Sequence, residues 1–233
     1  MVITKMKKEI SISAVVLLAI TMLLNCSKKN EKQPILLTDF EGNTYKTVNI
    51  GNQTWMAENL KTTMLNDGTP ISLVKSENDW RELTTPGYCW YNNDEASFKD
   101  PYGALYNWYT AGTGKLCPAG WHIPEKQEWL VLGEFLNDST KAGAKLKEAG
   151  TAHWLTPNKG ADNSSGFTAL GSGIRYFEGT FASNLSYTSI WSSSETEHNE
   201  VWYISLFYAE TIVTLDHRNK KYGFSVRCLK DKL

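Results

Sequence analysis

The stretch CPAGWHIPEKQEWLVLGEFL, residues 117–136, constrains the fold most because it predicts the main helix of the chain. Pro124 suits the first turn of a helix, where its missing N–H costs nothing. Glu125 and Glu128 place negative charge near the positive end of the helix dipole. Apolar residues then recur at helical spacing and predict one buried face, formed by Ile123, Trp129, Leu132, Phe135 and Leu136. A shorter helix is predicted over residues 140–149.

Short strands are expected on both sides of this helix. Residues 36–60 carry turn signals around an alternating segment at 44–50, which predicts a small β-meander. Phe224, Val226 and Cys228 share one face of a last strand that should return beside this meander. We expect a polar loop over 92–100, a short helix within 102–111 and a long ordered loop over 150–166. Further strands are predicted at 167–181, 190–193, 201–206 and 211–215. This pattern indicates an α+β domain.

The first residues form a targeting segment. Lys5, Lys7 and Lys8 precede an uncharged apolar run over residues 10–24, which is short for a span of about 20 residues and typical of a signal peptide. The run ends in Leu-Leu-Asn-Cys, which resembles a bacterial lipobox with Cys26 as the lipidated residue. We therefore predict a signal peptide over 1–25, a tether over 26–35 and one domain over 36–233. Ordinary secretion with cleavage elsewhere, or a retained anchor helix, are the alternatives.

Charge and composition argue against a nucleic-acid surface. The chain has 24 basic and 25 acidic residues. Removing residues 1–25 takes away three lysines and one glutamate, so the remaining chain has a net charge of 21 − 24 = −3. Nine Trp and 11 Tyr suit either a large core or flat rings on a binding surface.

The cysteines fit an exported protein. With Cys26 assigned to lipid, Cys89, Cys117 and Cys228 allow at most one internal bridge and one remaining thiol. On the residues alone, any pairing of these three or no bridge at all stays open.

Catalytic motifs are absent from the sequence. There is no nucleophile elbow, P-loop or G-x-G-x-x-G, and no histidine pair at the H-E-x-x-H spacing of zinc enzymes. A carboxylate pair for glycoside hydrolysis stays open, because such residues can be far apart in sequence. We expect His122 to be a hydrogen-bonded structural residue, and we expect a binding function without a catalytic one.

An aromatic and polar run is the candidate ligand site. Sugar sites pair a flat ring with amide and carboxylate groups, because pyranoses have apolar faces and hydroxyl edges. The candidates are Trp90, Tyr91, Asn92, Asn93 and Asp94, with Trp154 as a second ring. The alternative is that Trp90 is core and the asparagines only shape a turn. No cofactor is expected, although oxygen ligands at 92–95 and at Glu195, Glu197 and Glu200 leave calcium possible. A solvated acidic loop is the other interpretation of these groups.

Seven sequence blocks are distributed along the chain. They are WMAENL (55–60), YCWYNND (88–94), YGALYNWYT (102–110), CPAGWHIP followed by EW (117–129), SSGFTALGSGIR (164–175), WSSSE (191–195) and GFSVRCLKD (223–231). These blocks resemble the Fibrobacter succinogenes major paralogous domain, which occurs in many lipoproteins of the Bacteroidetes group. They occur in the family's order over residues 38–231, nearly the whole mature chain.

The resemblance implies a fold similar to C-type-lectin-like and formylglycine-generating-enzyme-like domains, with short antiparallel strands around one main and one shorter helix. Lectin-like domains commonly tie the start of the helix region to the last strand, which implies a Cys117–Cys228 bridge. Formylglycine-generating enzymes use two late cysteines, and here only Cys228 is late. Sugar-binding lectins carry W-N-D where this chain has WSSSE, so their calcium site does not carry over.

We therefore expect an exported lipoprotein of the cell envelope, in the outer membrane, that acts as a binding module. Its expected partners are the membrane, through the N-terminal lipid, and a glycan or protein ligand. A secreted polysaccharide-acting or formylglycine-generating-like enzyme is the alternative function.

Lipidation at Cys26 is directly testable. Labelled fatty acid should enter the parent protein, and Cys26→Ala should block the labelling because the acceptor thiol is gone. Equal labelling of the variant would contradict the assignment.

Overall fold

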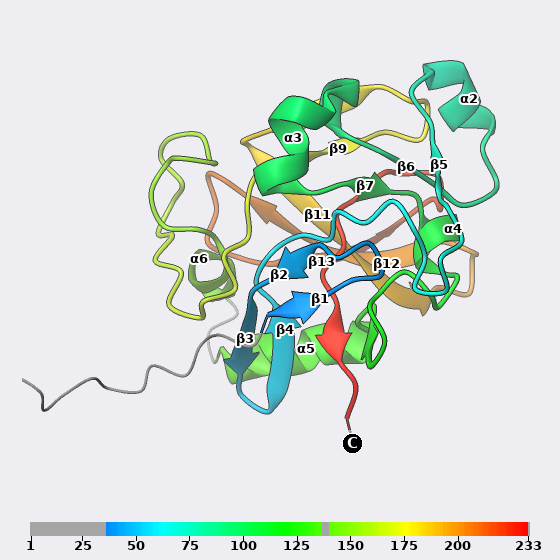
Figure 1. The fold of residues 1–233 in the computed structure, drawn as a ribbon. Helices are drawn as coiled ribbons and strands as arrows, with labels where there is room; N and C mark the ends of the chain where they lie inside the picture. The colour runs from blue at the N-terminus through cyan, green and yellow to red at the C-terminus, as the bar shows by residue number, and fades with distance from the viewer. Residues whose placement is uncertain (1–35, 137–139, 233) are drawn as a thin grey trace, which may run out of the picture. The chain divides into compact units, whose positions relative to one another are not determined.

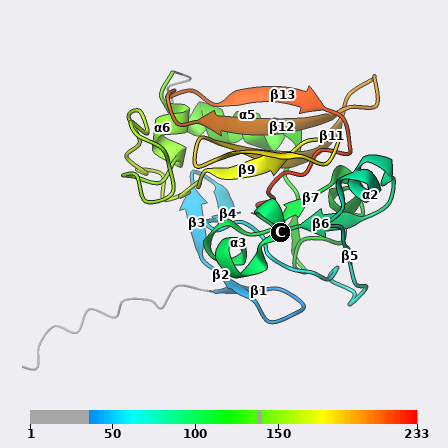
Figure 2. The same cartoon turned by 90° about the horizontal axis from the view of Figure 1, so that it is seen from above.

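The described residues, 36–136 and 140–232 of a computed structural model, form several small sheets joined by short helices (Figures 1 and 2). They all belong to one compact unit. The predicted signal peptide at 1–25, Cys26 and the tether at 26–35 lie outside the described residues. Among the described residues, no helix is long and apolar enough to cross a membrane.

The largest sheet has five strands in the order β10-β9-β11-β12-β13. Neighbouring strands are antiparallel except β9 and β11, which are parallel. The strands predicted within 167–181 and at 190–193, 201–206 and 211–215 have counterparts in this sheet, although the last of them begins three residues later than predicted. The strands are β9 (Ser172–Arg175), β10 (Phe181–Asn184), β11 (Tyr187–Glu195), β12 (Val201–Phe207) and β13 (Thr214–Arg218).

Smaller sheets hold the N-terminal and C-terminal segments together. In the sheet β3-β4-β14-β8, Leu229 pairs with Trp55, and the Met56 N–H donates to the Cys228 carbonyl at 3.0 Å. The last segment returns beside the N-terminal meander as predicted, but its strand is β14 at Leu229–Lys230, and the predicted strand residues Phe224 and Cys228 lie outside it. The strands are β1 (Leu37–Thr38), β2 (Thr44–Tyr45), β3 (Thr47–Ile50), β4 (Gln53–Met56), β5 (Ser72–Leu73), β6 (Gly87–Cys89), β7 (Leu105–Tyr106), β8 (Trp121–His122) and β14 (Leu229–Lys230).

The main helix begins two residues later than predicted. Glu125 is its N-cap residue, and the Glu125 N–H donates to the Glu128 carboxylate at 3.0 Å, so Pro124 precedes the helix. Phe135 was wrongly placed on the buried face, because 58% of its surface is exposed. The helices are α2 (Glu77–Glu82), η1 (Tyr91–Asn93), α3 (Glu95–Tyr102), α4 (Trp108–Ala111), α5 (Lys126–Phe135) and α6 (Ala142–Leu146).

The loop predicted over residues 92–100 is instead mostly helical. The Asp94 carboxylate accepts the Ser97 N–H at 3.1 Å and starts α3, so the acidic residue caps a helix that lacks a strong apolar period. The short helix expected within 102–111 is divided into β7 and α4, and the Asn107 side chain caps α4.

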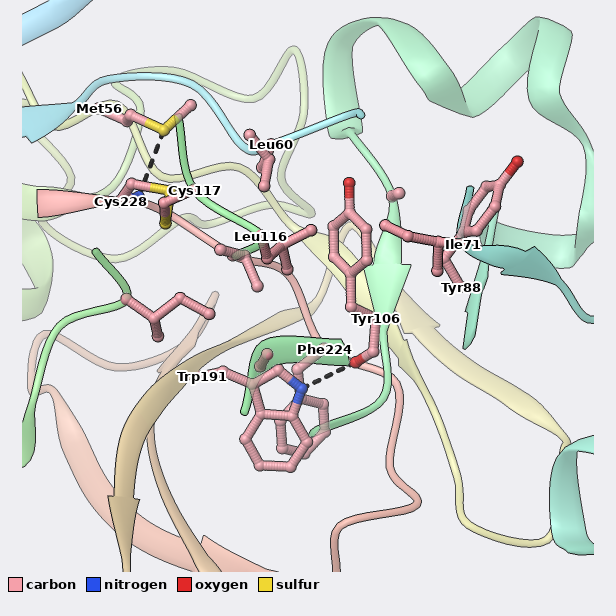
Figure 3. Close-up of a cluster of buried hydrophobic side chains, with 14 of the residues drawn as sticks. Met56, Leu60, Ile71, Tyr88, Tyr106, Leu116, Cys117, Trp191, Phe224 and Cys228 are labelled. Atoms are coloured by element: carbon pink, nitrogen blue, oxygen red, sulfur yellow. Dashed lines mark hydrogen bonds between the residues drawn. A yellow bond between two sulfur atoms is a disulfide. The ribbon is translucent and has the colours of Figure 1, made fainter. Parts of the chain in front are cut away.

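The five-stranded sheet separates two hydrophobic clusters. Tyr203 of β12 lies in one cluster with Trp191 and Phe224, whereas the next residue, Ile204, lies in the other with Trp129 of α5. This alternation is the two-residue period of a strand covered on both faces. Figure 3 shows the first cluster, where the Trp191 indole N–H donates to the Tyr106 carbonyl at 2.8 Å.

The predicted Cys117–Cys228 bridge is confirmed, with the two Cα atoms 5.9 Å apart (Figure 3). It joins the segment that leads into β8 and α5 to the segment that leads into β14. Cys89 is a buried free thiol, and burial raises its pKa to about 12. It is therefore protonated and unreactive at neutral pH, as expected of an inert core cysteine.

Removing the bridge should be costly, because it closes a loop with a sequence separation of 111. We expect Cys117→Ala combined with Cys228→Ala to lower the free energy of unfolding by about 2–5 kcal/mol in urea. Reduction of the parent should have the same effect. A parent whose urea midpoint is unchanged by reductant would contradict the stabilising role.

Candidate functional site

Both tryptophans predicted to bind ligand are core residues. Trp90 and Trp154 each expose only 1% of their surface. The Trp90 ring meets Tyr88 edge to face at 5.5 Å, and the Trp154 indole N–H donates to the Ala169 carbonyl at 2.9 Å. Their ring faces are used by the protein itself, so the predicted stacking role is wrong for both.

The rest of the predicted site forms a turn. Tyr91 is buried against Phe98 and Phe181, with ring centroids 5.0 and 5.4 Å away. Asn92 and Asn93 have φ angles of 52° and 59°, in the left-handed region that asparagine tolerates. With Asp94 used as a helix cap, the alternative that these polar residues shape a turn is the one the structure shows.

The possible calcium ligands also have other partners. The Glu195 carboxylate accepts from Lys220 Nζ at 2.6 Å, and the Glu200 carboxylate lies 2.5 Å from His217 Nδ1. Within residues 36–136 and 140–232, no group of three or more His, Cys, Asp or Glu side chains is arranged to hold a metal ion.

A different set of rings gathers on the five-stranded sheet. The register of β12 and β13 pairs Tyr203 with Asp216, and the strand period places Arg218 on the same face. The turn after β9 and the segment after β13 add further rings. We name this set the tyrosine–arginine surface; it comprises Tyr176, Phe177, Tyr187, Tyr203, Asp216, Arg218 and Tyr222.

An ion pair lies at the centre of the tyrosine–arginine surface. The Arg218 guanidinium is 2.8 Å from the Asp216 carboxylate and 5.7 Å from the Tyr203 ring centroid. The Tyr203 hydroxyl donates to Asp216 at 3.4 Å. Burial, together with Tyr187, raises the pKa of Tyr203 well above its usual value. Tyr203 itself is buried, with 3% of its surface exposed, so the site presents the half-buried guanidinium and carboxylate to solvent, and the Tyr203 phenol supports them from the core.

Partly exposed rings lie beside this ion pair. The Tyr222 ring contacts Tyr176 at 5.9 Å, Phe177 at 5.7 Å and the core residue Phe224 at 5.5 Å. Phe177 exposes 44% of its surface. The rings thus extend from the hydrophobic cluster of Figure 3 to solvent.

Arg175 positions the loop that carries two of these rings. Its guanidinium is buried and donates to the carbonyls of Gly179, Val74 and Lys75 at 2.8, 2.5 and 2.9 Å. Its backbone forms a bridge with Gly223, next to Tyr222. One buried cation therefore fixes both the turn after β9 and the segment beside it.

The tyrosine–arginine surface suits a polar ligand with apolar faces. Flat rings can cover the face of a sugar, while the guanidinium donates to hydroxyl groups and the carboxylate accepts from them. Sequence reasoning missed the tyrosine–arginine surface, because its residues are spread over 176–222 and only one or two of them lie in each segment. The signal that existed was the alternation of Asp216 and Arg218 in β13.

His122 has the hydrogen-bonded structural role that was predicted. Its Nδ1 lies 2.6 Å from Asp231 and its Nε2 lies 2.9 Å from Glu128, so it joins the C-terminal segment to α5. Partial burial lowers the pKa of His122, but hydrogen bonds to Asp231 and Glu128 outweigh this effect and leave the pKa raised.

Comparison with known proteins gives one match. The model of the Fibrobacter succinogenes major domain matches residues 48–230, which includes the whole tyrosine–arginine surface and both His122 and Glu128. No curated protein and no solved structure matches the chain.

The raised pKa of His122 predicts a pH-dependent stability. Because the folded pKa lies above the unfolded value of 6.5, the stabilisation is complete below pH 6.5 and is lost as the pH rises through the folded pKa. We expect His122→Gln to remove this dependence, measured as the free energy of unfolding between about pH 6 and 8. His198→Gln, a change at an exposed histidine, is the control and should retain the parent profile.

Proposed function

This chain belongs to the Fibrobacter succinogenes major domain family, and from this premise we propose that it is a lipid-anchored binding module of the cell envelope whose ligand is a glycan. The tyrosine–arginine surface is the observation that carries the proposal. Anchoring at Cys26 in the outer membrane is part of it. We also propose a C-type-lectin-like topology, which the Cys117–Cys228 bridge between the helix region and the last strand supports.

The proposed ligand contacts follow from the chemistry of the tyrosine–arginine surface. Tyr222 and Phe177 offer rings against which a pyranose face packs. Arg218 retains N–H groups beyond the one directed at Asp216, because a guanidinium has five donors. Sugar hydroxyls at the ring edge can therefore accept from Arg218 and donate to Asp216.

The surface is also held in place before any ligand arrives. Arg218 and Tyr203 share the Asp216 carboxylate, and Arg175 fixes the turn that carries Tyr176 and Phe177. A site whose side chains are already ordered loses less conformational entropy on binding. This favours recognition of a preferred sugar geometry over loose adhesion.

Substitution of the surface tests this proposal. Cell-wall polysaccharides and a glycan array should identify a ligand of the full-length protein. Tyr222→Ala and Arg218→Ala should each weaken binding about tenfold by calorimetry, equivalent to about 1.4 kcal/mol. Phe135→Ala is the matched control because its exposed ring lies on α5, which packs on the other face of the sheet.

Unchanged affinity in both surface variants would contradict the assigned site. Capture of a protein and not of any glycan would overturn the ligand class. A further outcome is that the protein releases shortened sugars from a bound polysaccharide and that Asp216→Asn abolishes the release. The function would then be hydrolysis and not binding alone.

A further inference from the structure

The hairpin formed by β1 and β2 presents apolar side chains close to the start of the described chain. Phe40, in the turn between the strands, exposes 57% of its surface, and Leu36, just before β1, exposes 50%. Both lie within a few residues of the segment that leads to Cys26. Exposed apolar side chains are common on protein surfaces, and what distinguishes these two is their position beside the segment that leads to Cys26.

The residues beside Phe40 are fixed by hydrogen bonds. The buried Asp39 carboxylate accepts the N–H groups of Glu41 and Asn43 at 3.0 and 2.9 Å and the Tyr45 hydroxyl at 2.6 Å. These bonds direct Asp39 into the domain. Phe40 follows this anchored residue directly, and its side chain is held at the surface of the domain.

Glu41 is anchored in the same manner. Its carboxylate accepts the Thr62 hydroxyl at 2.8 Å and the N–H and hydroxyl of Thr63 at 2.5 and 2.7 Å. Partial burial raises the pKa of Glu41, but the bonds from Thr63 and Thr62 outweigh it and leave the pKa lowered. The charge next to Phe40 is therefore directed toward protein donors.

The Phe40 ring rests on a glycine turn. A Cβ atom built at Gly68 would lie 2.8 Å from the ring, so only glycine allows this close approach, and its φ is +84°. Asp67, next in the turn, pairs with Lys115 at 2.8 Å. The ring thus has a rigid support, and the carboxylate of the neighbouring Asp67 has a cationic partner.

The chain before the hairpin is basic. Residues 27–34 contain Lys28, Lys29 and Lys32 against Glu31, a charge of 3 − 1 = +2. Basic residues near a membrane are attracted to anionic lipid headgroups. The residues from 26 to 35 span at most about 36 Å when extended, so an anchor at Cys26 would keep the hairpin within reach of the bilayer.

We propose that the Phe40 hairpin docks on the anionic phospholipid surface that holds the lipid anchor, an inference that rests on the proposed anchoring at Cys26. Phe and Leu partition into the interface of a bilayer, and an added apolar contact strengthens a lipid anchor. The tether raises the local concentration of the surface, so even a small contact area is sufficient.

Docking would also orient the domain. Figure 2 shows β1 and β2 on one side of the described chain and β12 and β13 on the opposite side. With the hairpin on the membrane, the β12–β13 side of the large sheet faces away from the bilayer.

Fluorescence quenching in vesicles tests this orientation. The full-length protein is placed in phosphatidylethanolamine vesicles containing phosphatidylglycerol and brominated acyl chains. An environment-sensitive maleimide is attached to Thr38→Cys in β1 or, as the matched site, to Thr214→Cys in β13. Both threonines are exposed strand residues, and Cys89 is buried while Cys117 and Cys228 are bonded, so they do not compete for the dye.

We expect quenching at position 38 to exceed that at position 214 by about threefold or more, and Phe40→Ser to bring the two to the same level. Phe135→Ser, which removes an exposed ring from α5, should leave the difference unchanged. Equal quenching at both positions, or no effect of Phe40→Ser, would overturn the docking. If either result is found while fatty acid still labels Cys26 and glycan binding persists, only the docking proposal is overturned, and the proposed anchoring and glycan binding stand. Dye uptake by Cys26 in the parent would show an unmodified thiol and overturn the anchoring on which the docking rests.

Discussion

The passage of residues 223–230 through the interior is the constraint on which the other elements depend. Phe224 and Tyr106 exchange backbone hydrogen bonds, and the Ser225 N–H donates to Ser189 at 3.0 Å. Further along, Val226 accepts from Leu60, and Leu229 pairs with Trp55. One short segment thus contacts three separate sheets. These backbone pairs replace the hydrogen bonds that the buried segment would otherwise lack, so the sheets and the segment stabilise one another.

Buried cations reinforce this arrangement without carboxylate partners. The Arg227 side chain is fully buried and donates to Asn59 at 2.7 Å and to the carbonyls of Phe167 and Thr168. Lys147 donates to three carbonyls, including that of Glu210 at 2.8 Å, and burial lowers its pKa to about 8. Carbonyl dipoles satisfy the N–H groups and fix loop backbones at the same time. Arg175 donates to carbonyls in the same way next to the tyrosine–arginine surface. The hydrogen bonds that stabilise the core therefore also hold the geometry of the site.

Local sequence signals predicted the elements better than the site. The period of Trp129 and Leu132 predicted α5, the short apolar segment at 201–206 predicted β12, and the family resemblance predicted the Cys117–Cys228 bridge. Exposure of a given ring is a tertiary property, so composition could not show that Trp90 and Trp154 are buried while Tyr222 borders solvent. The cap at Asp94 was missed because a single acidic residue before a weakly periodic segment resembles a loop.

The isolation of Cys89 has a consequence for oxidative folding. In the unfolded chain, Cys89, Cys117 and Cys228 permit three different pairings, and thiolate attack can exchange them. Once Cys89 is enclosed by the hydrophobic cluster around Trp80, its thiol neither reaches the Cys117–Cys228 bond nor ionises readily. Thiol–disulfide exchange with Cys89 therefore stops when the core forms. The Cys117–Cys228 pairing is then kinetically protected until the domain unfolds.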